Sequence, residues 1–286
     1  MTTTPNGGEA GTITLGGALT VSRMGFGAMR LMGDDIWGPP EDPEAAKRVL
    51  HLALDLGVSF LDTADAYGPE LDEYLIAETL HPYPEGLVIA TKGGVVRNGP
   101  GGWERDGRPE HLRRAVVNSL RRLRLERIDL YQLHAPDPEV PVEDSVGALA
   151  RLQEEGKIRF VGLSNFDVDQ LERVRDITRI DSVQNEYNVL FREESDPVVE
   201  WCERSGAAFI PWRPIAAGEL DDPRLDAVAE AHEATPVQIA LAWLFRRSPA
   251  MLPIPGTASE AHLRENVAAA SIRLSDREME RLNAAG

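Results

Sequence analysis

Cysteine is nearly absent from this chain of 286 residues, in which Cys202 stands alone. One cysteine cannot form a disulfide within the chain, and it cannot build a cysteine-based zinc cluster. Six histidines are present, but no two lie three or four residues apart, as the zinc-binding pairs of helices do. We therefore expect no metal site, and a reducing cytoplasm as the compartment.

Long apolar runs are missing as well. No stretch approaches the roughly 18 uninterrupted apolar residues of a membrane-spanning helix. The first eight residues also lack the basic and apolar parts of a signal peptide. The sequence therefore predicts no membrane partner, and a flexible tail over residues 1–10.

Basic charge is scarce. Lys and Arg number 30 against 47 Asp and Glu, so the net charge is −17 and the isoelectric point is near 4.8. A field of this sign repels phosphate, which argues against nucleic-acid partners and anionic membranes. Arginines do gather between residues 113 and 127, and we interpret this basic run as the solvated face of a helix.

What remains is the composition of a globular protein with ample core, since 42% of residues are hydrophobic and mean hydropathy is −0.27. No linker-like segment divides the chain, so we expect one domain over residues 1–286. Short β-branched runs alternate with longer amphipathic runs. Strands are expected over residues 23–26, 58–61, 87–90, 128–133, 158–162, 182–185, 208–211 and 251–254.

Each expected strand is followed by an expected helix. The helices fall near residues 43–56, 69–80, 109–124, 141–155, 167–178, 195–205, 224–245 and 259–270. Eight such units favour an α/β fold whose parallel sheet closes into a (β/α)8 TIM barrel, with an open doubly wound sheet as the alternative.

Two glycine-containing segments refine this interpretation. The segment Gly25-Phe-Gly-Ala-Met-Arg30 begins like a dinucleotide fingerprint, but Arg30 replaces the third glycine, so we reject a Rossmann fold. Two short β-branched runs, 12–15 and 19–23, flank Gly16-Gly17 and predict an N-terminal β-hairpin.

Reactive side chains follow three successive expected strands. Asp62 and Tyr67 follow the second strand, Lys92 the third and His134 the fourth. In a barrel these positions meet at the carboxyl-terminal mouth, where barrel enzymes carry their active sites. Each residue alone has an ordinary structural explanation, such as a helix cap or a packed phenol, but their combination favours an active site.

The combination suits carbonyl reduction. A carbonyl group that accepts a hydride needs a proton, which Tyr67 could donate. The ammonium of Lys92 would lower the pKa of that phenol, and Asp62 would keep the ammonium from being an unpaired buried charge. His134 could hydrogen-bond the substrate oxygen and polarise the carbonyl group.

The segments Phe60-Leu-Asp-Thr-Ala-Asp-Ala-Tyr-Gly68, Ala90-Thr-Lys-Gly-Gly94 and Leu133-His134 resemble the aldo-keto reductase family, and the similarity runs from Met24 to Asn266. That family folds as a (β/α)8 barrel and reduces aldehydes and ketones with NADPH through an Asp-Tyr-Lys-His tetrad. The resemblance implies that this tetrad consists of Asp62, Tyr67, Lys92 and His134, with Tyr67 as the general acid.

The resemblance also implies a nicotinamide site. Ser164, Asn165 and Gln184 would hold the carboxamide of the cofactor, and Trp212 would stack on the nicotinamide ring. Further cofactor contacts are implied for Asp62, for the first loop and for the loop after the seventh strand, at Gly27, Ala28, Met29, Arg213, Pro214 and Ile215.

The adenosine-phosphate end of the cofactor is implied in the last segment, at Gly256, Thr257, Ser259, His262, Glu265 and Asn266. A helix beginning near Ser259 would direct backbone N–H groups at a phosphate. Gly256 and His262 stand where lysine and arginine are frequent in the family, and both positions would touch the 2′-phosphate. A subset of the family has this form, so we expect NADPH/NADP+, with NADH as the open alternative.

A small-molecule carbonyl compound is the expected substrate. Trp37 and Trp103 lie in loops and could wall an aromatic substrate, or pack against helices instead. Three segments, 37–40, 183–188 and 234–244, resemble bacterial members related to pyridoxal reductases, which makes pyridoxal a trial substrate. A natural-product tailoring reductase would carry the same tetrad.

Two other functions stay open at this point. The family resemblance includes channel-associated β subunits, so a non-catalytic NADPH-binding regulatory subunit is one alternative. A barrel isomerase that binds a phosphate-bearing substrate at its last two loops is the other. The sequence predicts neither the natural substrate, nor the direction of the reaction, nor the oligomeric state.

Overall fold

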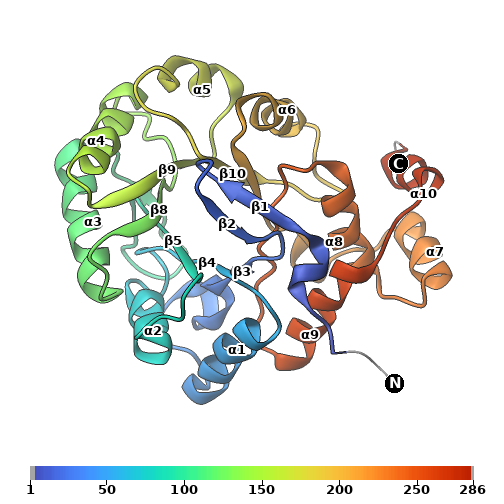
Figure 1. The fold of residues 1–286 in the computed structure, drawn as a ribbon. Coiled ribbons are helices and arrows are strands. Elements are labelled where there is room, and N and C mark those ends of the chain that lie inside the picture. The colour runs from blue at the N-terminus through green and yellow to red at the C-terminus, as the bar shows by residue number, and fades with distance from the viewer. Residues whose placement is uncertain (1–3, 285–286) are drawn as a thin grey trace.

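The protein is described here by a computed structural model, which covers residues 4–284. Seven parallel strands form one curled sheet in the spatial order β11-β10-β9-β8-β5-β4-β3, and helices surround it (Figure 1). The strands are β3 (Phe26–Gly27), β4 (Phe60–Asp62), β5 (Val88–Gly93), β8 (Ile128–Leu133), β9 (Ile158–Ser164), β10 (Ser182–Glu186) and β11 (Ala208–Trp212).

The eighth expected strand closes this sheet through only a few hydrogen bonds. Met251 forms an isolated parallel bridge to Phe209, and the Leu252 N–H donates to the Phe209 carbonyl at 2.9 Å. On the other side, the Gly25 N–H donates to the Pro253 carbonyl at 3.0 Å. Proline cannot donate to a ladder, which limits pairing in this segment. The sheet is nevertheless joined edge to edge, and the predicted (β/α)8 barrel is confirmed.

The helices wrap the outside of the barrel. They are α1 (Pro43–Asp55), α2 (Leu71–Leu80), α3 (Pro109–Arg122), α4 (Val142–Glu154), α5 (Val168–Val174), α6 (Asp196–Ser205), α7 (Pro223–Ala231), α8 (Pro236–Arg247), α9 (Glu260–Ala268) and α10 (Asp276–Asn283). The predicted single helix over 224–245 is wrong, because Thr235 and Gln238 form a capping box that starts α8, and Pro236 occupies its first turn. The terminal helix α10 was not predicted.

The predicted hairpin covers the amino-terminal end of the barrel. Strands β1 (Thr12–Leu15) and β2 (Leu19–Ser22) pair antiparallel. At the turn between them, Gly16 has φ 57°, and a Cβ there would lie 2.0 Å from the Phe160 ring, so the turn requires glycine. Of the expected tail, residues 1–3 lie outside the described residues. Gly7–Ala10 form a 3₁₀ turn, and the Gly7 N–H donates to the Leu56 carbonyl at 2.7 Å.

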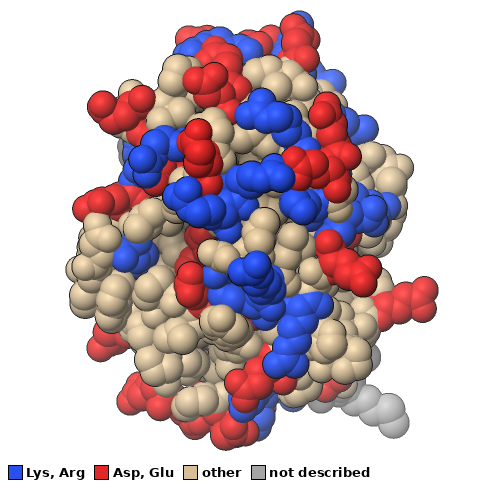
Figure 2. All heavy atoms as spheres, turned by 90° about the vertical axis from the view of Figure 1, so that its left-hand side faces the viewer, with Lys and Arg blue, Asp and Glu red and all other residues tan. Residues whose placement is uncertain are grey.

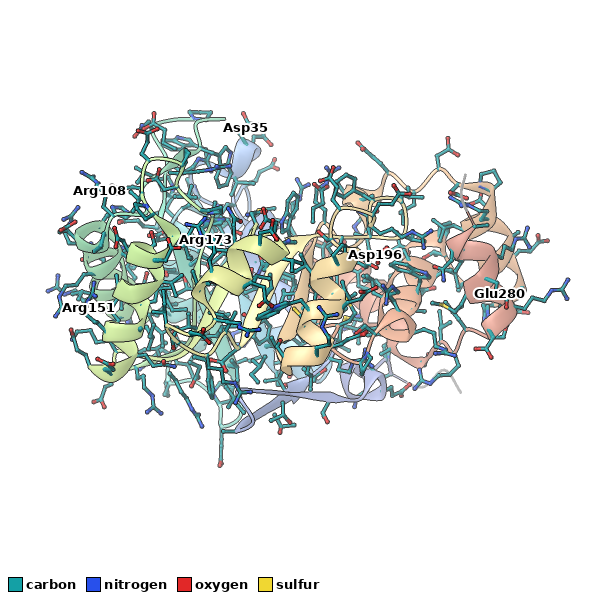
Figure 3. The ribbon with its side chains drawn as sticks, turned by 90° about the horizontal axis from the view of Figure 1, so that it is seen from above. Asp35, Arg108, Arg151, Arg173, Asp196 and Glu280 are labelled. Carbon is teal, nitrogen blue, oxygen red and sulfur yellow. The ribbon has the colours of Figure 1, made fainter. Side chains whose placement is uncertain are left out.

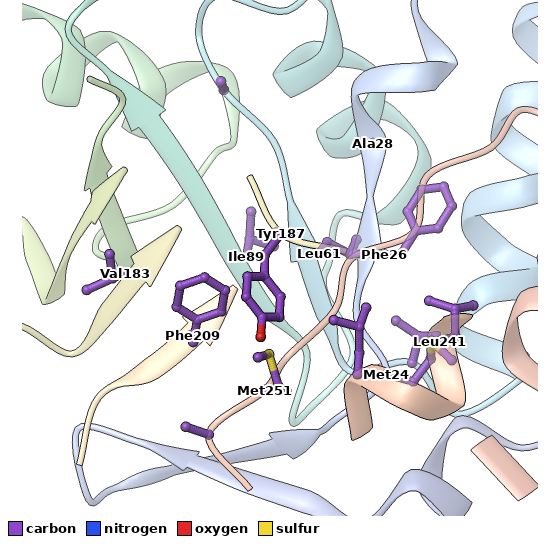
Figure 4. Packing of buried hydrophobic residues seen from close by; sticks show 14 of the residues in the cluster. Met24, Phe26, Ala28, Leu61, Ile89, Val183, Tyr187, Phe209, Leu241 and Met251 are labelled. Atoms are coloured by element: carbon purple, nitrogen blue, oxygen red, sulfur yellow. The ribbon is translucent and has the colours of Figure 1, made fainter. Parts of the chain in front are cut away.

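Side chains alternate between the two faces of the barrel wall, as they must in a strand. Outward-facing residues pack under the helices in a large apolar core. Tyr187, for example, lies edge-on to Phe209, with ring centroids 5.4 Å apart (Figure 4). It also stacks on Trp243, with ring centroids 5.6 Å apart. A second apolar cluster fills the barrel interior beneath the hairpin and includes Leu15, Phe60, Val88, Leu130, Phe160 and Ile210.

The outer surface carries interleaved charges of both signs. On the face over the left-hand side of Figure 1, Lys and Arg alternate with Asp and Glu (Figure 2). In the predicted basic run, Arg113 pairs with Glu155 at 2.5 Å, and Arg122 is buried against Glu73 at 2.5 Å. Within residues 4–284, no helix is long and apolar enough to cross a membrane.

Candidate active site

Three reactive side chains meet at the carboxyl-terminal mouth of the barrel. The ammonium Nζ of Lys92 in β5 donates to Asp62 Oδ1 at 2.5 Å and to the Tyr67 hydroxyl at 3.1 Å. A third bond runs from the ammonium to the Thr63 carbonyl at 3.1 Å. All three side chains are buried, so each of these hydrogen bonds is formed away from bulk water.

Strand register explains why these residues meet. Asp62 pairs with Ala90 in the ladder between β4 and β5. Lys92 lies two residues past Ala90, so its side chain points to the same inner face, one step closer to the mouth. The loop after β4 then turns back, and the Tyr67 N–H donates to the Ala64 carbonyl at 3.2 Å. The phenol is thereby brought over the ammonium.

His134 lies just past β8, beside the phenol. Its ring centroid is 5.9 Å from that of Tyr67, and the two rings are nearly perpendicular. Its backbone N–H donates to the Gly93 carbonyl at 2.9 Å, while its buried Nδ1 has no partner in the part of the chain that is described. Burial, assisted by the charge of Lys92, lowers the pKa of His134 well below its usual range. The imidazole is therefore neutral at physiological pH.

The phenol and the ammonium also have shifted pKa values. Burial raises the pKa of Tyr67, and the opposing effect of Lys92 is smaller, so the phenol stays protonated more strongly than a free tyrosine. This differs from the expectation that Lys92 would lower the pKa below the ordinary value. Burial alone would lower the pKa of Lys92, but the attraction of Asp62 and Tyr67 raises it, so the lysine remains charged.

Two glutamine side chains complete the hydrogen bonding of Asp62. Gln132 and Gln184 each donate a side-chain N–H to Asp62 Oδ2 at 2.9 Å. Gln132 was not among the residues predicted from the sequence. Its signal is that it is a polar residue on the inward side of an otherwise apolar strand. The two amides and Lys92 together hold the buried carboxylate in one orientation.

A cavity of about 600 Å³ opens from these residues along the barrel rim. Asp62, Tyr67 and Gln184 lie on its lining beside Trp212. Most residues predicted to bind a cofactor also line it, namely Gly27, Met29, Arg213, Pro214, Ile215, Gly256, Thr257, His262, Glu265 and Asn266. The predicted residues therefore share the lining of one cavity.

The other predicted residues do not line the cavity. Ala28 is fully buried, and Ser164 Oγ accepts a hydrogen bond from Asn165 at 3.1 Å. Asn165 in turn accepts a bond from Trp212 Nε1 at 3.0 Å, which fixes the indole. Ser259 caps α9 by accepting a hydrogen bond from the His262 N–H at 3.4 Å.

Several features of the rim fit a dinucleotide. A Cβ on Gly256 would lie 2.4 Å from the Gly27 carbonyl oxygen, so the chain passes there as a cradle that only glycine permits. Asn266 Nδ2 is buried and has no partner among the described residues. The amino end of α9 adds backbone donors suited to phosphate.

A family model described as "Aldo/keto reductase family" matches residues 23–286. The chain belongs to the aldo/keto reductase family. The assignment makes it an NAD(P)H-dependent oxidoreductase of small carbonyl compounds, as predicted.

Relatives of this aldo-keto reductase cover nearly its whole length. An uncharacterized oxidoreductase of Schizosaccharomyces pombe is 48% identical over 280 residues, which are 97% of this chain and 90% of the relative. Pyridoxine 4-dehydrogenase of Escherichia coli is 41% identical over 276 residues, covering 94% and 96%. The crystal structure of an aldo-keto reductase from Klebsiella pneumoniae in complex with NADPH matches with a TM-score of 0.80 at 27% identity, covering 95% of this chain and 93% of that one.

The cavity of this aldo-keto reductase also has a lining residue that was missed. Arg30 lines it, and its Cγ lies 3.6 Å from where a Cβ of Gly256 would be. In the sequence this arginine counted only as a missing third glycine. Its position beside Gly256 depends on two segments far apart in the chain, which no local pattern reports.

The two tryptophans predicted to contact substrate do not line this cavity. The ring centroid of Trp103 is 6.2 Å from that of His134, and the side chain is 42% exposed. Trp37 lies near the guanidinium of Arg97, whose Cζ is 5.6 Å from its ring centroid.

Proposed function

We propose that this protein reduces an aldehyde or ketone to an alcohol with NADPH, and that Tyr67 donates the proton. The observation that carries the proposal is the hydrogen-bonded series Asp62–Lys92–Tyr67 at the inner end of a cavity shaped for a dinucleotide. The Klebsiella pneumoniae relative, crystallised with NADPH, supports the choice of cofactor.

The proton chemistry follows from the charges around Tyr67. Because burial raises its pKa, the phenol carries its proton at neutral pH and is ready to give it to a carbonyl oxygen. The phenolate left behind lies 3.1 Å from the Lys92 ammonium, which stabilises it. Neutral His134 assists by hydrogen-bonding the substrate oxygen. NADPH supplies the hydride when it is bound.

We assign the nicotinamide end of the cavity to Trp212, with Ser164, Asn165 and Gln184 around the carboxamide. The Trp212 indole is already held by Asn165 at 3.0 Å, so little side-chain freedom is lost when a ring stacks on it. Gln184 donates to Asp62 at 2.9 Å, and its amide oxygen leaves an acceptor for a carboxamide N–H.

We assign the adenosine-phosphate end to the segment from Gly256 to Asn266, with Arg30 as its cation. Lysine at position 256 is prevented by the close Gly27 carbonyl, and Arg30 lies beside that position. Arg213 also lines the cavity, but it pairs with Glu186 at 3.1 Å. Arg30 and His262 are therefore the side chains that favour NADPH over NADH.

The proposal is tested by Tyr67→Phe, which removes the proton donor and keeps the ring. We expect kcat for a panel of aldehydes to fall by about 10³-fold, followed as loss of NADPH absorbance, while the Kd for NADPH stays within twofold. Tyr74→Phe, at a 53% exposed phenol on α2, is the matched control and should keep wild-type turnover. Wild-type turnover in Tyr67→Phe would show that another group supplies the proton.

Pyridoxal is the first substrate to test, with pyridoxine for the reverse direction. The 41% identity to pyridoxine 4-dehydrogenase supports this choice. The broader carbonyl panel serves the alternative of a natural-product tailoring reductase. Tight NADPH binding with no turnover of any carbonyl compound would favour the non-catalytic subunit instead.

A further inference from the structure

Arg97 is a buried cation whose hydrogen bonds go to backbone carbonyls. Its side chain follows β6 (Val95–Val96) and is only 7% exposed. It donates to the carbonyl oxygens of Asp35 at 2.9 Å, Ile36 at 3.3 Å and Ala66 at 3.5 Å. Among residues 4–284 no carboxylate forms an ion pair with Arg97, and a buried guanidinium without such a pair is unfavourable, so we looked for a role of Arg97 other than charge pairing.

These acceptors belong to separate loops at the mouth. Asp35 and Ile36 lie in the loop before Trp37, and Figure 3 shows Asp35 at the end of the barrel opposite the hairpin. Ala66 precedes Tyr67 in the next loop. The two loops are also joined directly, because the Gly38 N–H donates to the Gly68 carbonyl at 2.9 Å and the Gly68 N–H to the Ile36 carbonyl at 3.2 Å. Arg97 therefore ties its own loop to both.

The same guanidinium lies against two indole rings. Its Cζ is 3.8 Å from the ring centroid of Trp103 and 5.6 Å from that of Trp37. Trp103 stands next to β7 (Glu104–Arg105), which pairs with β6 to form a short ribbon. Cation–π contact and the ribbon together hold the Trp103 ring in place.

Ring contacts then continue from Arg97 to the reacting phenol. The Trp103 ring is edge-on to His134 at 6.2 Å, and His134 is edge-on to Tyr67 at 5.9 Å. Because Arg97 covers one side of the indole and the residue is still 42% exposed, the indole presents open apolar surface beside the carbonyl-binding groups.

We propose that Arg97 is a positioning residue that holds Trp103 beside His134, and that the exposed indole binds planar aromatic carbonyl substrates. The inference rests on the proposed function, because it places the carbonyl oxygen at Tyr67 and His134. The ring of an aromatic aldehyde then lies against Trp103, whereas a small aliphatic aldehyde does not reach it.

The test compares two aldehydes in Arg97→Met, which keeps a long apolar side chain but removes the planar cation and its donors. For 2-naphthaldehyde we expect kcat/KM to fall about tenfold, through KM, as expected for loss of an aromatic stack. For propanal it should change less than twofold, and the Kd for NADPH should not change. Arg97→Lys keeps the charge without the planar fork, so its kcat/KM for 2-naphthaldehyde should lie between those of the wild type and Arg97→Met.

A double-mutant cycle isolates the route through Trp103. If Arg97 acts by positioning the indole, Arg97→Met should have no further effect on naphthaldehyde in a Trp103→Leu background. Additive losses, or an equal loss for both aldehydes, would overturn the proposal. Absence of NADPH oxidation by the wild type with either aldehyde would instead count against the proposed function.

Arg23 provides a matched control at the other end of the barrel. It also donates to three backbone carbonyls, those of Phe245 at 2.9 Å, Ser248 at 2.6 Å and Met251 at 3.2 Å, and it lies over the Phe245 ring. Arg23→Met should lower thermal stability and leave the ratio of the two kcat/KM values unchanged. A changed ratio in this control would show that global loosening, not the mouth, sets substrate preference.

Discussion

The two halves of the barrel interior differ in composition although they lie on the same strands. Phe60, Ala90 and Leu130 face inward at the hairpin end and belong to an apolar cluster. Two residues further along those strands, Asp62, Lys92 and Gln132 also face inward and form a buried polar network. Two residues span roughly 7 Å of strand. Within that distance the interior changes from an apolar layer to the polar layer that holds the proposed catalytic groups.

The difference shows how one wall can combine stability with reactivity. Apolar burial beneath the hairpin tolerates variation in shape as long as volume is kept. The polar layer has no such tolerance, because each buried donor or acceptor left without a partner destabilises the fold. Stability and function should therefore respond to different substitutions, even on one strand.

The largest difference between the effect on activity and the effect on stability is expected from Lys92→Met. We expect kcat/KM for carbonyl reduction to fall about 10³-fold, because the Tyr67 phenolate loses its neighbouring cation. The comparison is Leu130→Ala in the apolar layer, which should lower the free energy of unfolding by about 2–5 kcal/mol and change kcat little in the fraction that stays folded. Both variants are measured by denaturant unfolding and steady-state kinetics.

Similar losses of activity in the two variants would contradict the division between layers. It would mean that the apolar layer also sets the geometry of the reacting groups. A result of that kind would move the boundary between core and active site toward the hairpin.

A smaller effect is expected from Arg30→Met at the cavity rim. Removing this cation should raise the Kd for NADPH about tenfold and leave the Kd for NADH nearly unchanged, if it faces the 2′-phosphate. Titration of tryptophan fluorescence gives both constants without turnover. Arg277→Met, which removes another exposed arginine, is the control and should change neither. An equal increase in the Kd for NADPH and the Kd for NADH would instead indicate that Arg30 contacts the pyrophosphate.

The last expected effect concerns stability and comes from Asp72→Asn, behind the polar layer. Asp72 accepts a hydrogen bond from the Thr63 hydroxyl at 2.7 Å, and burial raises its pKa to about 7. The unfolded chain releases this proton near the ordinary value of 3.8, so the native protein loses stability as pH rises from about 4 through 7. The variant should remove that loss.

Thermal unfolding at pH 5 and pH 8 measures the effect of Asp72→Asn. Relative to the variant, the wild type should lose on the order of 2 kcal/mol between these values. Asp176→Asn, at a side chain that is 94% exposed, is the control and should have the same stability as the wild type at both pH values. Parallel behaviour of Asp72→Asn and wild type would mean that Asp72 titrates near its ordinary pKa.

Residues at strand ends could be predicted from the sequence because the alternation of a strand is local. An apolar run followed by Asp62, or by His134, fixes which residues reach the mouth. Helix ends were predicted less well, since a capping box inside the apparent helix 224–245 was overlooked. Gln132 carried a signal that was not used.

Contacts between distant loops could not be predicted. Arg97 lies about 60 residues from Asp35 and Ile36 in the sequence, and no periodic pattern in the sequence predicts its place beside two tryptophans. Arg30 beside Gly256 is the same kind of contact over a longer separation. Such contacts depend on the closed barrel and appear only once the fold is known.

The closing segment around Pro253 has a consequence for how the chain is made. The edges of β3 and β11 stay open until residues 251–254 have left the ribosome and arrive between them. Until then a growing polypeptide presents two unpaired strand edges and an unfinished apolar interior, which are the features that promote aggregation. Protection from neighbouring chains is therefore needed most just before residues 251–254 emerge.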